Sequence, residues 1–290
     1  MGLYEMDHET GINMFKTYEE EEKMKLGTIG CGLIANAILG GIVNNKLINP
    51  AEILVSDIYL PSLEKIKDTL GVNITQDNKE AAKADIVLIA IHPRFCPDVF
   101  DEIAETVQEN GTIVWSVAAG VTLDEIQSHI GADQKIVRTM PNTCATVGAA
   151  VTAVAPNDNV TEEEVEELTR LIGGFGAAER MPERLLNGII PVTGSSPAMI
   201  FMLIDAMANG AAREGFPWDQ AIRLSAQAVK GSAEMVLKSG KHPAELQNQV
   251  CTPGGITIEM VKKLEECGFR NAVMEAMGAC TENLDDRKGE

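Results

Sequence analysis

Short apolar runs alternate with amphipathic segments from Lys25 to about Ala155. Such alternation is typical of a parallel sheet whose two faces are covered by helices. The apolar runs predict strands at residues 26–30, 52–56, 86–90, 112–116 and 135–139. Apolar positions at helical spacing predict helices at residues 36–46, 61–71 and 97–110.

The second half of the chain has a different pattern. A capping box at residues 161–164 opens a helix that runs to about Ile172. From Pro182 onward the strand signals disappear, and helical periods are separated by turns rich in Gly and Pro. The pattern therefore predicts an α/β domain over residues 26–180 and an all-α domain over residues 181–290.

One predicted helix of the second half, at residues 199–208, is apolar on nearly every side. Because a surface helix of a small domain has a polar face, this pattern indicates burial against a second subunit. The alternative is a core helix enclosed within one chain. The apolar stretch at residues 197–208 is short and interrupted by Asp205, so we expect no membrane anchor.

Charge and cysteine content narrow the functional classes. The chain has 290 residues and a formal net charge of −19, which argues against nucleic-acid and anionic-membrane partners. Its six cysteines form no Cys-x-x-Cys pair, so we expect neither a disulfide framework nor a metal site. Residues 1–25 are acidic and lack a signal-peptide pattern, and we interpret them as an added arm of a cytoplasmic protein.

The first predicted strand leads directly into a G-x-G-x-x-A sequence that opens a helix. Gly30 permits a tight turn, Gly32 lets the backbone approach a pyrophosphate, and Ala35 allows close packing of helix on strand. Leu33 and Ile34 lie between Gly32 and Ala35 in this fingerprint. The alternative is a structural turn. We predict a Rossmann-type, doubly wound dinucleotide-binding domain with this loop in its cofactor site.

An acid ends the second predicted strand, as the dinucleotide hypothesis requires. The Asp57 carboxylate suits the ribose hydroxyls of NAD, and the next residue, Ile58, offers no cation for the extra phosphate of NADP. The cofactor is therefore NADH or NADPH, with NADH favoured. Ser56 remains able to bind a phosphate, and Asp57 alternatively caps the following helix.

Later strand ends should border the same cofactor. Ala90 ends the third predicted strand and His92 follows it. Ala118 follows the fourth strand, and Pro141 and Asn142 follow the fifth. His92 is a hydrogen-bond donor or proton carrier, or else a solvent-facing loop residue. The Asn142 amide suits a nicotinamide carboxamide, and equally suits a turn.

Two loops in the helical half present small residues at a helix start. Residues 252–257, here called the Gly-Gly loop, contain Gly254 and Gly255 and open a helix at about Thr257. Unpaired N–H groups and the helix dipole would attract a small carboxylate there, although an ordinary turn is the alternative. Ser195 lies in the second such loop, which a carboxylate or the nicotinamide edge can also approach.

Together these motifs resemble the pyrroline-5-carboxylate reductase family. The resemblance rests on residues 30–35, 116–122, 140–143, 194–198, 242–246, 252–257 and 266–270, and extends from about Lys25 to the end of the chain. It implies NADPH- or NADH-dependent reduction of the imino acid pyrroline-5-carboxylate to L-proline. It also implies a homodimer, or a larger assembly of dimers, with interlocked helical domains.

The resemblance assigns roles to particular residues. Thr252, Gly254, Gly255 and Thr257 would hold the substrate carboxylate and ring nitrogen, with the partner subunit supplying the loop. Thr257 would bond the nitrogen and is the catalytic candidate. By the same resemblance, Ala118, Pro141 and Asn142 would border the nicotinamide.

Several positions depart from the family pattern. His92 stands where the family usually has Lys, and residues 187–192 differ from the usual approach to the Gly-Ser loop. Ser196 replaces a Gly, Cys144 replaces a Pro, and Leu33-Ile34 replaces Asn-Met. Two alternatives therefore stay open: a reductase of a different imino acid, and a dinucleotide-binding sensor without catalysis.

Overall fold

The computed structural model describes residues 24–286. Most of the predicted acidic arm, including its Glu run, lies outside these residues. Within them, eight strands form one sheet in the order β3-β2-β1-β4-β5-β6-β7-β8. The strands are β1 (Leu26–Ile29), β2 (Ile53–Ser56), β3 (Asn73–Thr75), β4 (Ile86–Ile89), β5 (Ile113–Ser116), β6 (Ile136–Met140), β7 (Ala150–Pro156) and β8 (Gly176–Arg180).

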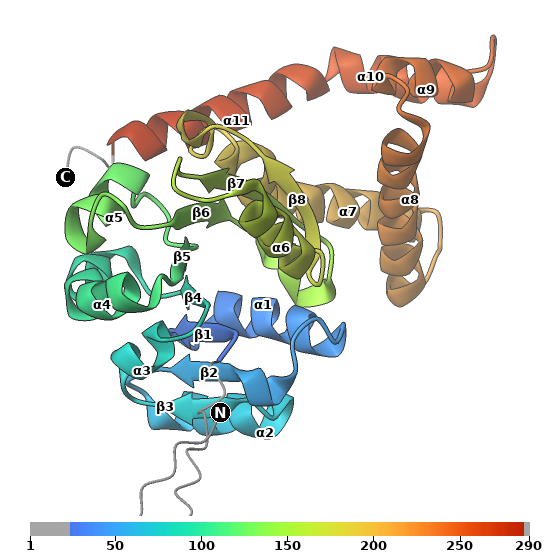
Figure 1. Cartoon of the computed structure of the whole chain (residues 1–290). Coiled ribbons are helices and arrows are strands. Elements are labelled where there is room, and N and C mark those ends of the chain that lie inside the picture. The colour runs from blue at the N-terminus through green and yellow to red at the C-terminus, as the bar shows by residue number, and fades with distance from the viewer. Residues whose placement is uncertain (1–23, 287–290) are drawn as a thin grey trace, which may run out of the picture.

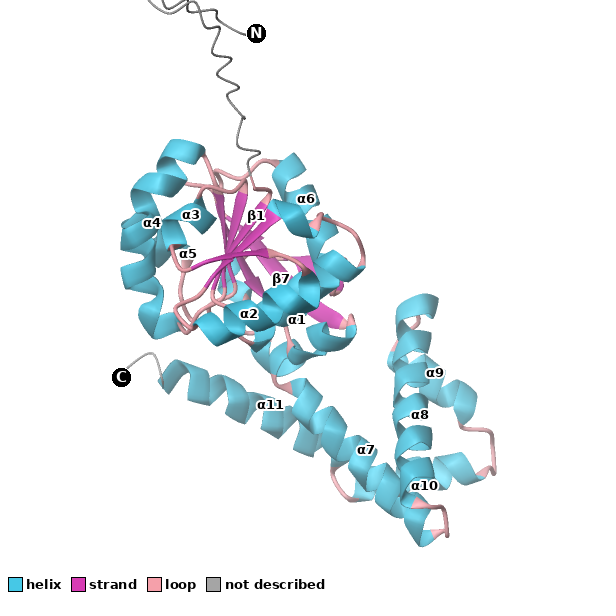
Figure 2. Ribbon diagram, turned by 90° about the horizontal axis from the view of Figure 1, so that it is seen from below, coloured by secondary structure: helices cyan, strands magenta, loops and turns pink. Residues whose placement is uncertain are grey.

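Helices cover both faces of this sheet (Figure 2). One face carries α1 (Leu33–Asn44), α2 (Leu60–Leu70) and α6 (Glu162–Ile172), whose apolar side chains form one buried cluster with Trp115 and Phe175. The other face carries α3 (Asn78–Ala82), α4 (Cys96–Asn110) and α5 (Leu123–Ile130), which form a second cluster. Strands β1, β4 and β5 are buried along their whole length, as expected of strands that helices cover on both faces.

The predicted α/β class and its Rossmann-type domain are confirmed. All five predicted strands are present, and the capping box at Thr161 forms as expected. Expectation and structure differ at the far edge, where β7 pairs antiparallel with β6. The 3₁₀ turn η3 (Thr143–Val147) joins those two strands, and so short a link permits only an antiparallel return.

The helical half begins with the 3₁₀ turn η4 (Glu183–Leu185) and the π-helical turn η5 (Ile190–Gly194). It continues with α7 (Ser196–Arg213), α8 (Trp218–Ser239), α9 (Pro243–Val250), α10 (Ile256–Glu266) and α11 (Phe269–Asp286). These helices form an arm that projects from the sheet domain, with α9 and α10 at its far end (Figures 1 and 2). Helix α11 runs back from α10 toward the sheet domain (Figure 1).

Helix α7 is not enclosed within the chain. Among its side chains Phe201 is 63% exposed and Met202 is 74% exposed, and the buried residue of this helix is Ala208. The helix extends beyond the apolar stretch at residues 197–208: the helical run Ile190–Arg213 has 24 residues and, by length and composition only, is apolar enough to cross a bilayer. An apolar helix so little covered needs another partner.

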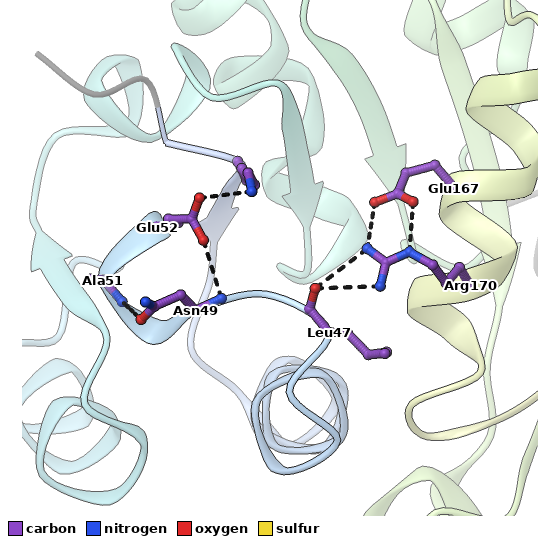
Figure 3. A network of polar contacts seen from close by, with 7 residues as sticks. Leu47, Asn49, Ala51, Glu52, Glu167 and Arg170 are labelled. Atoms are coloured by element: carbon purple, nitrogen blue, oxygen red, sulfur yellow. Dashed lines mark hydrogen bonds and ion pairs between the residues drawn. The ribbon is translucent and has the colours of Figure 1, made fainter. Parts of the chain in front are cut away.

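A polar network at the amino ends of the strands holds the α1–β2 connection to α6 (Figure 3). Lys25 pairs with Glu52 at 2.8 Å, and Glu52 also accepts the Asn49 N–H at 3.3 Å. Arg170 donates to the Leu47 carbonyl at 3.3 Å and makes a two-pronged bond to Glu167. This network braces the fold at the edge opposite the predicted cofactor site.

Candidate active site

The loop between β1 and α1 has the geometry that the fingerprint predicts. Gly30 has a φ of +99°, and a Cβ there would lie 2.5 Å from the Ala90 carbonyl oxygen, so only glycine fits. A Cβ on Gly32 would meet nothing within 4 Å, which leaves the backbone open on that side. Ala35 is fully buried where α1 packs on the sheet.

Two side chains hold this loop in place. Asn36 donates from Nδ2 to the carbonyls of Cys31 and Gly32, each at 2.8 Å. Asp57 accepts the Cys31 N–H at 2.7 Å through Oδ2 and the Tyr59 N–H at 2.8 Å through Oδ1. Burial raises the pKa of the Cys31 thiol, with a smaller contribution from the Asp57 charge. Asp57 therefore acts as a clamp between the fingerprint loop and the turn after β2.

The start of α1 fits a pyrophosphate. Gly32 is the N-cap and supplies no side-chain hydrogen bond, and the first turn contains no acid. The Leu33 side chain is 68% exposed, whereas Ile34 is partly buried against the core. Uncapped N–H groups and the positive end of the helix dipole therefore face the open side of Gly32.

Ser56 does not have the role suggested by its position. Its side chain is fully buried, and its hydroxyl donates to Asn78 Oδ1 at 2.8 Å. Asn78 in turn donates to Glu102 at 2.8 Å. The expectation that Ser56 binds a phosphate is therefore corrected, because its hydroxyl is turned inward to a protein partner.

The loop after β4 is built around a short turn, η2 (Pro93–Phe95). His92 is exposed, and its Nδ1 accepts the Arg94 N–H at 3.3 Å, so it caps this turn. The Arg94 guanidinium lies 4.4 Å from the centre of the Phe95 ring. Arg94 supplies a permanent cation two residues after His92. This cation was missed from the sequence because only the Lys-to-His difference at position 92 was considered.

The ends of β5 and β6 differ in what they expose. Ala118 is nearly buried, and its N–H donates to Ser116 Oγ at 3.3 Å, whereas Pro141 is half-buried. The Asn142 side chain is 8% exposed and is directed to protein partners. Its Nδ2 donates to the Thr193 carbonyl at 2.8 Å, and its Oδ1 accepts the Cys144 N–H at 3.2 Å. The turn interpretation of Asn142 therefore fits the structure, and the nicotinamide interpretation of its side chain does not.

The Gly-Gly loop has the expected form at the start of α10. Gly255 is the N-cap without a side-chain hydrogen bond, and its N–H donates to the Thr252 carbonyl at 2.9 Å. Gly254 has a φ of +70°, which favours glycine. Thr252 and Gly254 are exposed, and Thr257 is half-buried. The loop thus presents a bare backbone at a helix N-terminus.

The second small-residue loop lies beside α11. Ser195 is exposed, and its Oγ lies 3.3 Å from Cys280 Sγ, so one of the two donates to the other. Both views place this loop near the sheet domain, where α7 begins, and place α10 at the far end of the arm (Figures 1 and 2). Within a single chain, the Gly-Gly loop therefore lies far from the fingerprint loop (Figures 1 and 2).

Two hollows on the described part of the chain lie away from this site. One hollow of about 480 Å³ lies against α8 beside Met235, and another of about 330 Å³ lies near Asp158 and Glu183. Neither is lined by the fingerprint or by the Gly-Gly loop.

The sheet topology and the fingerprint loop define a Rossmann-type oxidoreductase of the NAD(P)H-dependent class. Residues 25–120 match the family model described as NADP oxidoreductase coenzyme F420-dependent. Residues 183–286 match the model described as pyrroline-5-carboxylate reductase dimerisation.

The chain is 45% identical to pyrroline-5-carboxylate reductase from Escherichia coli K12, with 89% of this chain and 96% of that protein covered. A solved pyrroline-5-carboxylate reductase from Coxiella burnetii is 30% identical, with a TM-score of 0.85 over 91% of this chain and 98% of that one. A Plasmodium falciparum pyrroline carboxylate reductase with NADP bound is 26% identical, with a TM-score of 0.79 over 90% and 97% of the two chains. This chain belongs to the pyrroline-5-carboxylate reductase family.

Proposed function

We propose that this protein reduces pyrroline-5-carboxylate to L-proline with NADH or NADPH. The main support is the Gly-Gly loop, which places uncapped backbone N–H groups and two threonines at the start of α10. This arrangement suits a small carboxylate beside a ring nitrogen. The named relatives support the same substrate, since the similarity extends over nearly their whole length.

We further propose that each site is shared by two subunits. The Gly-Gly loop lies at the end of an arm directed away from its own fingerprint loop (Figure 1). The exposed apolar side chains of α7 support a partner chain as the cover for this arm. The dimerisation-family match spans all of α7 to α11, which supports a partner subunit rather than a bilayer.

In the shared site the residues have distinct tasks. The N–H groups at the start of α10 bind the carboxylate, with Gly254 and Gly255 allowing its close approach. The Thr257 hydroxyl bonds the imine nitrogen and passes on a proton from water, since a hydroxyl is no acid at neutral pH. Ala118 and Pro141 provide small surfaces against which a flat ring can lie. When bound, the nicotinamide supplies the hydride, so the protein mainly positions donor against acceptor.

We propose that NADH is preferred over NADPH. The Asp57 carboxylate is fixed by two N–H groups at the end of β2, where its charge would repel an added phosphate. Ile58 beside it is 90% exposed and carries no cation. A Plasmodium relative was solved with NADP bound, so we attribute the NADH preference to Asp57 and Ile58 of this chain and not to the family as a whole.

Three organisational proposals accompany this activity. We place the domain boundary after Arg180, where β8 ends. We assign the enzyme to the cytoplasm, where the reducing environment suits its six free cysteines. We assign residues 1–25 to an acidic arm that precedes the two domains.

A second candidate is a reductase of another imino acid. The π-helical turn Ile190–Gly194, with Pro191 buried inside it, occupies the stretch that departs from the family pattern. Such turns occur often at functional sites. A changed approach to the Ser195 loop would alter the room for the substrate ring.

The test measures nicotinamide oxidation with the purified full-length protein. We expect oxidation that depends on pyrroline-5-carboxylate and yields proline. Six-membered and acyclic imino acids, assayed alongside, should give a lower kcat/KM. The proposed activity would be contradicted if the folded protein bound the nucleotide but did not oxidise it in the presence of any of these imines. A higher kcat/KM with another imine would establish the second candidate.

A further inference from the structure

The Asn142 side chain joins two parts of the molecule that are 51 residues apart. It leaves the end of β6, at the edge expected to border the nicotinamide, and its Nδ2 reaches the Thr193 carbonyl at 2.8 Å. Its other polar atom, Oδ1, caps η3 by accepting the Cys144 N–H. Asn142 and Thr193 are each 8% exposed, so this bond is shielded from water.

The Thr193 carbonyl needs an outside donor because of its place in the chain. In an α-helix the N–H four residues later would donate to it. Here that residue is Pro197, which has no N–H. A buried carbonyl without a donor destabilises the folded state. Asn142 supplies the donor that the proline removes.

The acceptor lies at the root of the arm. Thr193 belongs to the π-helical turn η5, and the Ser195 N–H closes this turn on the Ile190 carbonyl at 2.8 Å. Helix α7 follows directly and leads to the rest of the arm. The direction in which the arm leaves the sheet domain is therefore fixed where Asn142 is bonded.

An apolar cluster supports the same junction. Met140, the last residue of β6, is buried with Ala153, Ala155 and Leu186. Ile189 and Ile190 pack against this cluster, so the sheet edge and the start of η5 share one small core. A buried hydrogen bond and an apolar cluster therefore meet at this junction.

We propose that Asn142 is a positioning residue, which aligns the arm with the nicotinamide edge of the sheet. This inference rests on the proposed function, in which the arm carries the Gly-Gly loop to the partner's site. If the direction of the arm changes, the distance between the hydride donor and the imine carbon changes with it. Asn142 acts through Thr193 and touches neither substrate nor cofactor with its side chain.

The experiment compares Asn142→Ser with a double variant that also carries Pro197→Ala. Serine keeps an acceptor for the Cys144 N–H but cannot reach Thr193, whereas alanine at position 197 restores a backbone donor to the Thr193 carbonyl. Pro197→Ala alone is the reference for the double variant. Asn45→Ser is the matched control, because Asn45 Nδ2 donates to the distant Gly174 carbonyl at 2.9 Å away from the site.

We expect Asn142→Ser to lower kcat about 100-fold, the effect of a displacement near 1 Å. Equilibrium nucleotide affinity, measured by calorimetry, should stay unchanged. The double variant should recover at least about tenfold in kcat relative to Asn142→Ser, and Asn45→Ser should behave as wild type. Amide exchange at Ser195 should accelerate in Asn142→Ser and slow again in the double variant.

Two results would overturn the inference. One is weaker nucleotide binding with normal kcat at saturation, which would place the Asn142 amide on the nicotinamide. The other is a double variant no better than Asn142→Ser in kcat or amide exchange. If the wild-type protein itself reduced no imine, the proposed function would fail, and the exchange data would still decide whether Asn142 holds the junction.

Discussion

Replacing Gly255 by alanine tests the claim that the Gly-Gly loop binds the substrate. The backbone tolerates the change, because φ is −78° and ψ is 169°. The new Cβ would lie 2.4 Å from Thr252 Oγ1 and 3.0 Å from the Thr252 carbonyl oxygen. Ordinary contact begins near 3.4 Å, so the hydroxyl must move by about 1 Å.

That displacement sets the expected size of the effect. A 1 Å misplacement of a positioning group costs about 100-fold in rate, or about 2.7 kcal/mol of transition-state stabilisation. The loss of stability should be smaller, about 1 kcal/mol, since the residue is an N-cap at the surface. Activity should therefore fall much further than the melting temperature suggests.

The assay records nicotinamide oxidation at varied imine and saturating nucleotide, with thermal unfolding in parallel. Gly240→Ala is the control, because Gly240 has a φ of +63° in open space and its replacement strains the backbone away from the loop. We expect that control to keep its kcat/KM. Adding Thr252→Ala to Gly255→Ala should cause little further loss. Wild-type activity in Gly255→Ala, or an equal loss in Gly240→Ala, would refute the reasoning.

Three further expectations follow from other sites. Thr257→Ala should lower kcat about 100-fold by removing a hydrogen bond to the imine nitrogen, and Thr257→Ser should restore most of it; equal rates in all three proteins would contradict this role. Asp57→Asn should raise kcat/KM for NADPH relative to NADH at least about tenfold, because the repelling charge is gone, and an unchanged ratio would count against it. Hydrogen bonding to Arg170 lowers the pKa of Glu167 from 4.5, so this pair stabilises the fold above about pH 4.5 and loses its effect as the pH falls further. Glu167→Gln should cost about 0.5 kcal/mol of unfolding free energy at pH 7 and progressively less as the pH falls below 4.5. A loss in urea unfolding that keeps the same size throughout acid titration would refute this.

Local patterns in the sequence were enough for most of the fold. Strands such as β1 and β4 are buried on both faces, so their apolar runs stand out without any alignment. The edge strand β3 is short and only partly buried, and the edge strand β8 is largely exposed, so both carry little apolar signal. The antiparallel direction of β7 depends on how tightly η3 turns, which apolar periodicity does not report.

Site residues could be predicted from the sequence where their role depends on the backbone conformation of a few neighbouring residues. Gly30 is such a case, since its positive φ and its close approach to Ala90 belong to one tight turn. Side-chain partners were not predictable in the same way. Ser56 and Asn142 stand at strand ends like binding residues, yet their hydrogen bonds go to Asn78 and Thr193. Such choices depend on segments brought together only by folding.

The central claim is that one subunit's Gly-Gly loop completes the site of its partner, and subunit mixing tests it most directly. Thr257→Ala impairs the loop, and Gly32→Asp places a negative charge on the open side of the fingerprint loop, where no atom lies within 4 Å to disturb the fold. Each variant alone should be nearly inactive. Differently tagged copies, mixed in equal amounts and allowed to exchange, should regain about 25% of wild-type activity, because half of the dimers then hold one intact site. Purified mixed dimers with no more activity than their parents would contradict the claim.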